Sequence, residues 1–157
     1  MKRPSMPKHN EFTDTERPIS VADLDKIERA LGLAFPPDVR EHYLKRNGGS
    51  PNRYLFKRDD RVYVVQGFLS VRFGPSHNRL ENVFQDLKID REILPKKLVP
   101  FAIDPGGDYY CFSVDEVDKG AIYVFVGEHA DAPERATLRL ANSLPEFIEG
   151  MVDDEDD

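Results

Sequence analysis

The chain of 157 residues contains a single cysteine, no tryptophan and no long run of apolar residues. Because Cys111 has no partner in its own chain, an intramolecular disulfide is excluded and a cysteine-based metal site is disfavoured. A membrane-spanning helix needs about 20 consecutive apolar residues, and the sequence offers none. The opening residues lead into no hydrophobic segment, so we expect no secretory signal, no membrane association and a reducing, cytoplasmic location.

Known catalytic motifs are also missing. No GxSxG, HExxH, P-loop or dinucleotide-binding fingerprint occurs. The histidines (His9, His42, His77 and His129) are dispersed along the chain, and no two of them have the spacing of metal ligands. We therefore expect no catalytic residues, no metal site and no cofactor.

The net charge of −7 is distributed unevenly along the chain. Residues 40–97 carry 13 Lys and Arg against 7 Asp and Glu. Residues 98–134 carry Lys119 alone against eight acidic residues, and the last five residues of the chain are all acidic. Such a division predicts an electric field that steers binding partners, although it carries no information on the fold.

Helical patterns occur near both ends of the chain and once in the middle. Ser20 is a suitable N-cap for a first helix, and Pro36-Pro37-Asp38 begins a second helix that stops at Asn47-Gly48-Gly49. Apolar spacing predicts a third helix over 78–87, and a capping box at Ser143 begins the last one. The first two helices should form a helical hairpin.

The stretch from Val99 to Val114 predicts the centre of the fold. Two runs rich in β-branched and aromatic residues, Val99–Ile103 and Tyr109–Val114, flank Pro105-Gly106-Gly107, where the chain can reverse. Both runs are apolar on both faces, so we expect an antiparallel hairpin in the covered centre of a sheet. Further strands are expected over 54–57, 62–65, 67–73, 120–126 and 136–141.

Together these patterns predict an α+β fold, a mostly antiparallel sheet flanked by an N-terminal helical hairpin, an inserted helix and a C-terminal helix. Residues 1–17 show no periodicity, so we expect a disordered arm. Its basic residues are nearly balanced by acidic ones, which disfavours nucleic-acid binding. We expect residues 18–152 to form one domain and residues 153–157 an acidic tail.

An opening segment, the central hairpin and two later pieces together match a family pattern. The matching residues are Ile27, Glu28, Leu31, Gly32, Phe35, Pro36, Asp38, Arg40, Tyr43 and Asn47–Gly49, then Pro100–Asp104 and Gly106–Asp108, then Gly120, Ile122 and Tyr123, then Ser143, Leu144 and Phe147. This set resembles the SUKH superfamily, which includes a fungal regulator of cell-wall synthesis (Smi/Knr-like) and many bacterial immunity proteins. The likeness covers about residues 18–152, and Pro105 before the two glycines departs from the pattern.

The resemblance implies a non-catalytic immunity fold whose members bind and block a cognate polymorphic toxin, often a nuclease or deaminase. Because a nuclease holds phosphates in a basic cleft, an inhibitor can occupy that cleft with carboxylates. We therefore expect a basic, nuclease-type toxin as the partner protein. The candidate contact residues are Asp104, Asp108, Asp115, Glu116, Asp118 and Glu128, each of which is equally well explained as part of a solvated acidic face.

Other interpretations stay open at this point. One is a regulatory scaffold or adaptor of the Smi/Knr type that docks through its chain ends. Another is a small hydrolase in which Glu128 and His129 perform acid–base chemistry, with Asp104 and Asp108 as a second acid or a cation site. These two aspartates are also typical of turn residues that bind nearby backbone N–H groups.

Overall fold

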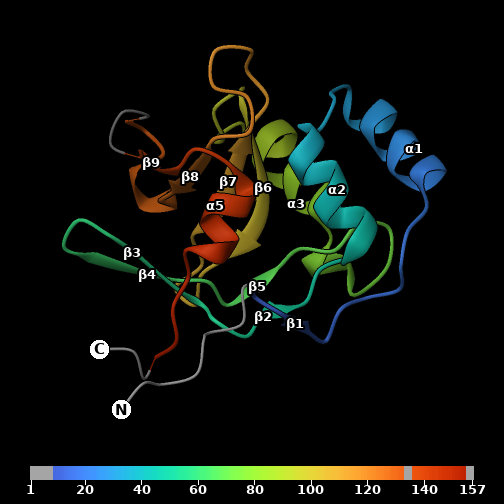
Figure 1. Ribbon diagram of the computed structural model, residues 1–157. Helices are drawn as coiled ribbons and strands as arrows, with labels where there is room; N and C mark the ends of the chain where they lie inside the picture. The colour runs from blue at the N-terminus through green and yellow to red at the C-terminus, as the bar shows by residue number, and fades with distance from the viewer. Residues whose placement is uncertain (1–8, 133–135, 155–157) are drawn as a thin grey trace.

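The structure, a computed structural model, describes residues 9–132 and 136–154. Across these residues it confirms the predicted α+β class, with a five-stranded antiparallel sheet flanked by helices (Figure 1). The strand order is β5-β6-β7-β8-β9, so neighbouring strands in the sheet are also consecutive in the chain. These strands are β5 (Gly67–Phe68), β6 (Leu98–Ile103), β7 (Tyr109–Ser113), β8 (Ile122–Phe125) and β9 (Thr137–Ala141).

Strands β6 and β7 form the predicted hairpin and occupy inner positions of the sheet. Pro100 in β6 cannot donate a backbone hydrogen bond, and the register shifts just after it, where a bulge accommodates the proline. At the turn, Gly107 has a φ of 97°, and the Asp104 carboxylate accepts hydrogen bonds from the backbone N–H groups of Gly106 and Asp108, both at 2.9 Å. Asp104 therefore closes the turn with its own side chain, as the turn interpretation expects.

The capping signals at Ser20 and Ser143 mark where the first and last helices begin, whereas the second helix ends at Lys45, before the predicted stop at Asn47-Gly48-Gly49. The Ser20 hydroxyl and the Asp23 carboxylate complete a capping box at the start of α1, and Gly32 ends this helix with a φ of 73°. At the start of α5, the Ser143 hydroxyl accepts the N–H of Glu146. The helical segments outside the central region include α1 (Val21–Leu31), α2 (Pro37–Lys45), α5 (Leu144–Glu149) and the 3₁₀ turn η3 (Gly127–His129).

The third helix is only partly as predicted. A 3₁₀ turn, η1 (Ser76–Asn78), precedes α3 (Leu80–Phe84), and the chain then continues as a π-helix, η2 (Gln85–Asp90). Its apolar stripe still faces the core, since Val83 and Leu87 are buried together with the residues at both ends of α3. The stripe therefore predicts the buried face and not the kind of helical turn.

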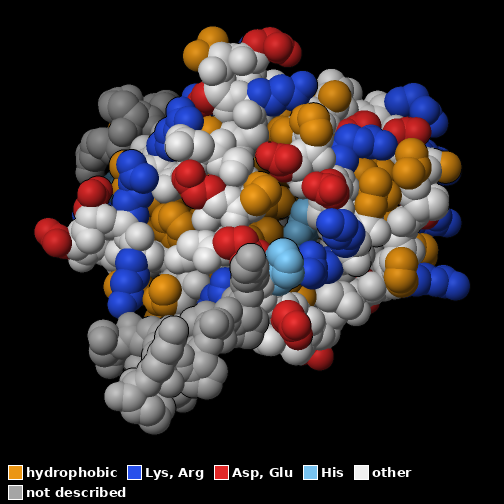
Figure 2. Space-filling model, in the orientation of Figure 1, with side chains coloured by type: hydrophobic (Ala, Val, Ile, Leu, Met, Phe, Trp, Pro, Cys, Tyr) orange, Lys and Arg blue, Asp and Glu red, His pale blue; other side chains and the backbone are white. Residues whose placement is uncertain are grey.

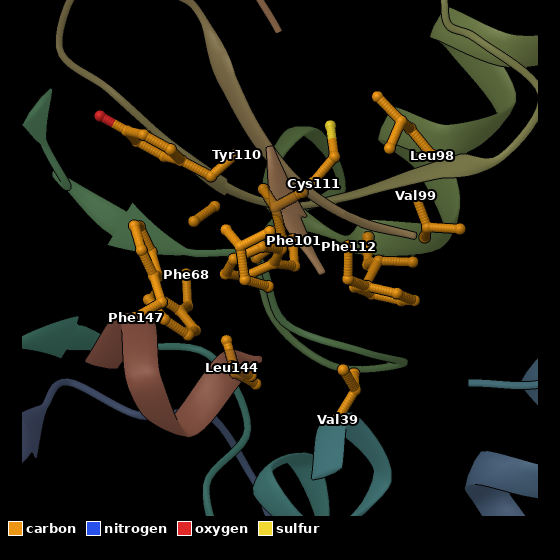
Figure 3. Packing of buried hydrophobic residues seen from close by; sticks show 14 of the residues in the cluster. Val39, Phe68, Leu98, Val99, Phe101, Tyr110, Cys111, Phe112, Leu144 and Phe147 are labelled. Carbon is orange, nitrogen blue, oxygen red and sulfur yellow. The ribbon is translucent and has the colours of Figure 1, made fainter. Parts of the chain in front are cut away.

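Both faces of the sheet are covered. Phe101 and Phe112 point towards α2 and α5, and the Phe101 ring lies 6.0 Å from the ring of Phe147 on α5 (Figure 3). Leu98 and Cys111 point towards the opposite face (Figure 3), where α3 contacts β6. Burial of each large side chain contributes about 1.5–3 kcal/mol. This two-sided packing explains why the hairpin strands are apolar on both faces.

The prediction of a disordered arm over residues 1–17 is wrong for residues 9–17, which are packed against the body. Strand β1 (Phe12–Thr13) pairs with β2 (Ser50–Pro51). The Asn10 side chain is buried, and its amide donates to the carbonyl of Arg53 at 2.7 Å. Contacts of this kind join distant parts of the chain and leave no periodic signal in a short segment. The folded body therefore starts before residue 18, while residues 1–8 lie outside the described residues.

A second small sheet forms a hairpin that projects from the body of the molecule (Figure 1). It consists of β3 (Leu55–Arg58) and β4 (Arg61–Val64). The Tyr110 hydroxyl anchors it by donating to the carbonyl of Val64 at 2.7 Å, and Val152 pairs with the first residue of β3. The described body thus extends to Val152, and the last three residues of the predicted acidic tail lie outside the described residues.

Residues of the opening signature are engaged in internal contacts. The Arg40 guanidinium on α2 donates to the carboxylate of Glu28 on α1 at 2.7 Å, and the same carboxylate accepts the N–H of Phe35 at 2.8 Å. The buried Tyr43 hydroxyl donates to the carbonyl of Leu69 at 2.8 Å. These signature residues therefore hold the helical hairpin together and fix it to the rest of the fold.

Candidate partner-binding cleft

The β3–β4 hairpin and one end of the main sheet enclose an open cleft of about 930 Å³. The hairpin tip, residues 58–61, forms one side, and the 104–108 turn and η3 contribute to the other. Val124 and Leu138 of β8 and β9 supply apolar lining. Figure 2 shows acidic side chains at the hairpin tip, at the left edge of the view, with basic side chains beside them. Its size is in the range of protein ligand sites, so this cleft is the candidate site.

Three of the predicted carboxylates, those of Asp104, Asp108 and Glu128, line this cleft. Partial burial raises the pKa of Asp108, and the negative charges of Asp104 and Glu128 raise it further. A hydrogen bond from the backbone N–H of Gly127, at 3.2 Å, opposes the rise in this pKa. The carboxylates are therefore close enough to repel one another, and a positive charge placed among them would be stabilised.

The hairpin tip adds two carboxylates that the sequence analysis did not select, Asp59 and Asp60. Asp59 has a φ of 56°, a conformation that aspartate and asparagine adopt more readily than other non-glycine residues. The Arg58 guanidinium donates to the carbonyl of Leu140 on β9 at 3.0 Å and so ties the tip to the main sheet. Tyr63 also belongs to the lining, although its hydroxyl oxygen is buried and makes no hydrogen bond within the described residues.

The other three predicted contact residues, Asp115, Glu116 and Asp118, lie at the opposite end of the sheet. They belong to the turn between β7 and β8, which projects at the top of Figure 1. Strand β7 separates this turn from the 104–108 turn, a distance of about 17 Å for five residues of extended chain. The predicted contact set therefore divides into two groups that cannot both face one small cleft.

Asp118 is part of an internal network. Its carboxylate accepts hydrogen bonds from the Lys97 ammonium at 2.8 Å, the Ser113 hydroxyl at 2.6 Å and the Tyr123 hydroxyl. Partial burial alone would raise the pKa of Asp118, but these hydrogen bonds outweigh it and lower the pKa to about 2. Asp118 is thus engaged in holding the β7–β8 turn against β6.

Glu128 and His129 are not arranged as an oriented acid–base pair. The Glu128 carboxylate and Nε2 of His129 are 4.0 Å apart, and the Glu128 side chain is 80% exposed. A working general base lies within about 3 Å of its proton-transfer partner. Within residues 9–132 and 136–154, no group of three His, Cys, Asp or Glu side chains has the geometry of a metal site.

Comparison with protein-family models matches residues 18–150 to the SMI1 / KNR4 family (SUKH-1). The chain belongs to this family. SUKH-1 proteins are generally non-catalytic immunity or regulatory proteins, and they bind partner proteins. A separate comparison with curated proteins gave no match. No helix in the described part of this SUKH-1 chain is long and apolar enough to cross a membrane.

The SUKH-1 match includes both sides of the cleft and the β7–β8 turn at the other end of the sheet. Sequence reasoning missed Asp59, Asp60 and Tyr63 as lining residues. The signal for the aspartates was the Arg58-Asp59-Asp60-Arg61 turn between two strands, yet nothing local indicates that this tip approaches residues 104–108. Tyr63 gives no signal, because a tyrosine in a half-exposed strand is ordinary.

Proposed function

We propose that this SUKH-1 protein is a non-enzymatic immunity-type protein that binds a cognate polymorphic toxin and neutralises it by covering its working surface. The observation that carries the proposal is the family match over residues 18–150, nearly the whole described body. SUKH-1 proteins act by binding partner proteins, so the surface of this chain is where its specificity should lie.

The internal role of the signature residues supports the proposal. Glu28, Arg40 and Tyr43 are all engaged in bonds within the fold. Side chains used in this way preserve the shape of the body and are not available to a substrate. A protein built like this can vary its surface for one partner while its frame stays constant.

The toxin should act on nucleic acid. An enzyme that holds phosphates presents a basic surface, and this chain carries a net charge of −7. Opposite charges accelerate the encounter of two proteins and discourage wrong partners. A basic nuclease-type module therefore fits this protein better than an acidic or apolar partner does.

The second candidate is an adaptor of the Smi/Knr type, which the same family match accommodates. An adaptor that docks through its chain ends would lose its partner when residues 1–8 and 153–157 are deleted. An immunity protein that binds through its body would keep its toxin. Residues 9–17 are left in place in this deletion, because β1 and Asn10 are packed into the body.

The proposed function is tested with the product of the reading frame next to the gene for this protein. If that reading frame encodes a large secreted protein, its C-terminal module is expressed in a bacterial host alone, with this protein, or with an unrelated acidic protein at equal level. We expect growth to stop with the module alone or with the unrelated protein, and to resume with this protein. Continued growth arrest at comparable expression would contradict the proposal.

A further inference from the structure

We propose that the cleft between the β3–β4 hairpin and the 104–108 end of the sheet is the contact surface, and that it takes an extended segment of the partner carrying lysine or arginine. This inference rests on the proposed function and names the part of the surface that performs it. It excludes the β7–β8 turn, which holds the predicted contact residues Asp115, Glu116 and Asp118.

Charge in the cleft comes from three separate parts of the chain. Asp59 and Asp60 come from the hairpin tip, Asp104 and Asp108 from the β6–β7 turn, and Glu128 from η3. Only two arginines line the cleft beside these five carboxylates, so the net charge of its lining is negative. One of them, Arg58, is already tied to the carbonyl of Leu140. A cationic side chain that enters the cleft can therefore approach carboxylates from both sides.

Repulsion among the carboxylates is only partly compensated. Partial burial and the charges of Asp104 and Glu128 raise the pKa of Asp108. Although the Gly127 N–H and the charge of His129 lower it, this pKa stays raised. Asp104 accepts the backbone N–H groups of Gly106 and Asp108, and Asp108 accepts one from Gly127. A guanidinium or ammonium group placed between these carboxylates would relieve the repulsion and form charge-assisted hydrogen bonds.

The lining also contains a feature that suits a polypeptide better than a free ion. Leu138 on β9 is 45% exposed, and with Val126 it offers an apolar surface for the aliphatic part of a lysine or arginine side chain. An isolated cation would not use this surface.

Two double variants test the location of the contact. Asp60→Asn with Glu128→Gln removes two charges from the cleft, and Asp115→Asn with Glu116→Gln removes the same two chemical groups from the opposite end of the sheet. All four side chains belong to exposed residues, so both variants should fold, and thermal unfolding checks this. Because the net charge changes equally, any general electrostatic effect is the same in the two proteins.

The first probe is the peptide acetyl-Gly-Arg-Gly-Arg-Gly-Arg-amide, titrated into the isotopically labelled full chain at low salt and followed by NMR. We expect amide shifts to concentrate in residues 58–63, 104–108 and 124–129. The cleft variant should weaken this binding by about fivefold or more, and the control variant by less than about twofold. Shifts centred on residues 113–121, or equal weakening by both variants, would overturn the inference.

The second probe is the toxin module used to test the proposed function. Wild-type protein should bind it, the cleft variant should bind about tenfold or more weakly, and the control variant should resemble wild type. If wild type neutralises the toxin and the cleft variant does so equally well, the inference is wrong and the proposed function stands. If wild type does not bind the toxin, the proposed function fails, and the inference fails with it.

Discussion

The side chain of Asn47 forms two hydrogen bonds with the backbone of Val71. Its Oδ1 accepts the N–H of Val71 at 2.7 Å, and its Nδ2 donates to the carbonyl of the same residue at 2.9 Å. Asn47 is 1% exposed and Val71 is fully buried. The Asn47 side chain thus pairs with the backbone of Val71 as a neighbouring strand would. It thereby joins the segment after α2 to the segment after β5.

Replacing Asn47 with alanine should lower the free energy of unfolding by about 3 kcal/mol, because two buried backbone groups lose their partners. Urea denaturation followed by circular dichroism measures the change. The matched control is Asn52→Ala, at an exposed residue, which should change stability by less than about 0.5 kcal/mol. Similar stability of the two variants would mean that water replaces Asn47 at little cost.

Replacing Gly49 with alanine should destabilise the protein more than the same change at Gly107. Both glycines have positive φ, 92° and 97°. A Cβ at Gly49 would lie 2.6 Å from the carbonyl oxygen of Thr13, whereas a Cβ at Gly107 meets no atom within 4 Å. We expect a loss of about 1–2 kcal/mol at Gly107 from backbone strain alone and a larger loss at Gly49. Faster proteolysis near residues 9–17 should accompany only the Gly49 change, because β1 must move.

His42 should make the protein sensitive to mild acid. Its ring lies among Phe12, Tyr43 and Phe68, and Nε2 is buried without a hydrogen bond within the described residues. Burial, and to a lesser extent the charges of Arg46 and Lys45, lower the pKa of His42 to about 3. In the unfolded chain the pKa of His42 is about 6.5, so below this pH the unfolded chain binds a proton that the folded protein does not bind. Stability therefore falls as the pH falls.

We expect the free energy of unfolding to decrease by about 1.4 kcal/mol per pH unit below about pH 6, before the carboxylates begin to titrate. His42→Phe should remove this slope between about pH 6 and pH 5, while His77→Gln, at an exposed residue, should retain it. Denaturant titrations at several pH values measure both. A slope that persists in His42→Phe would show that other groups cause the acid sensitivity.

Asp118→Asn should affect stability and leave partner binding unchanged. The substitution weakens the bonds from Lys97 and Tyr123, and we expect a loss of about 1–2 kcal/mol at neutral pH. Since the folded pKa of Asp118 is about 2, its stabilising contribution is lost as the pH falls below about 4, so the variant should show less acid sensitivity in that range. Asp115→Asn in the same turn is the control for both measurements. Weaker toxin binding by folded Asp118→Asn would return this end of the sheet to the contact surface.

Local signals in the sequence predict most of the helices and strands. The capping residues Ser20 and Ser143 and the glycines at positions 32 and 107 act within a few residues of where they stand, so their effect is readable from the sequence. The packing of Asn10 against Arg53 is not readable in this way, because it joins segments 43 residues apart. The same limit explains why the sequence of residues 9–17 gives no sign of their packing against the body.

The sequence places only part of the predicted contact set correctly in space, for a related reason. Asp104, Asp108 and Glu128 share the cleft, while Asp115, Glu116 and Asp118, which are close to them in sequence, lie at the other end of the sheet. In an antiparallel meander, successive turns lie at opposite ends of the sheet. That rule, applied to the predicted strands, separates the two groups without coordinates, whereas the approach of Asp59 and Asp60 requires the tertiary structure.

The most direct test of the proposed function is a titration of toxin activity with the full-length protein. The purified toxin module acts on its nucleic-acid substrate while increasing amounts of this protein are added. We predict that activity falls to the background rate near an equimolar ratio, because a covered working surface admits no substrate. Full activity in the presence of a large molar excess of folded protein would contradict the account.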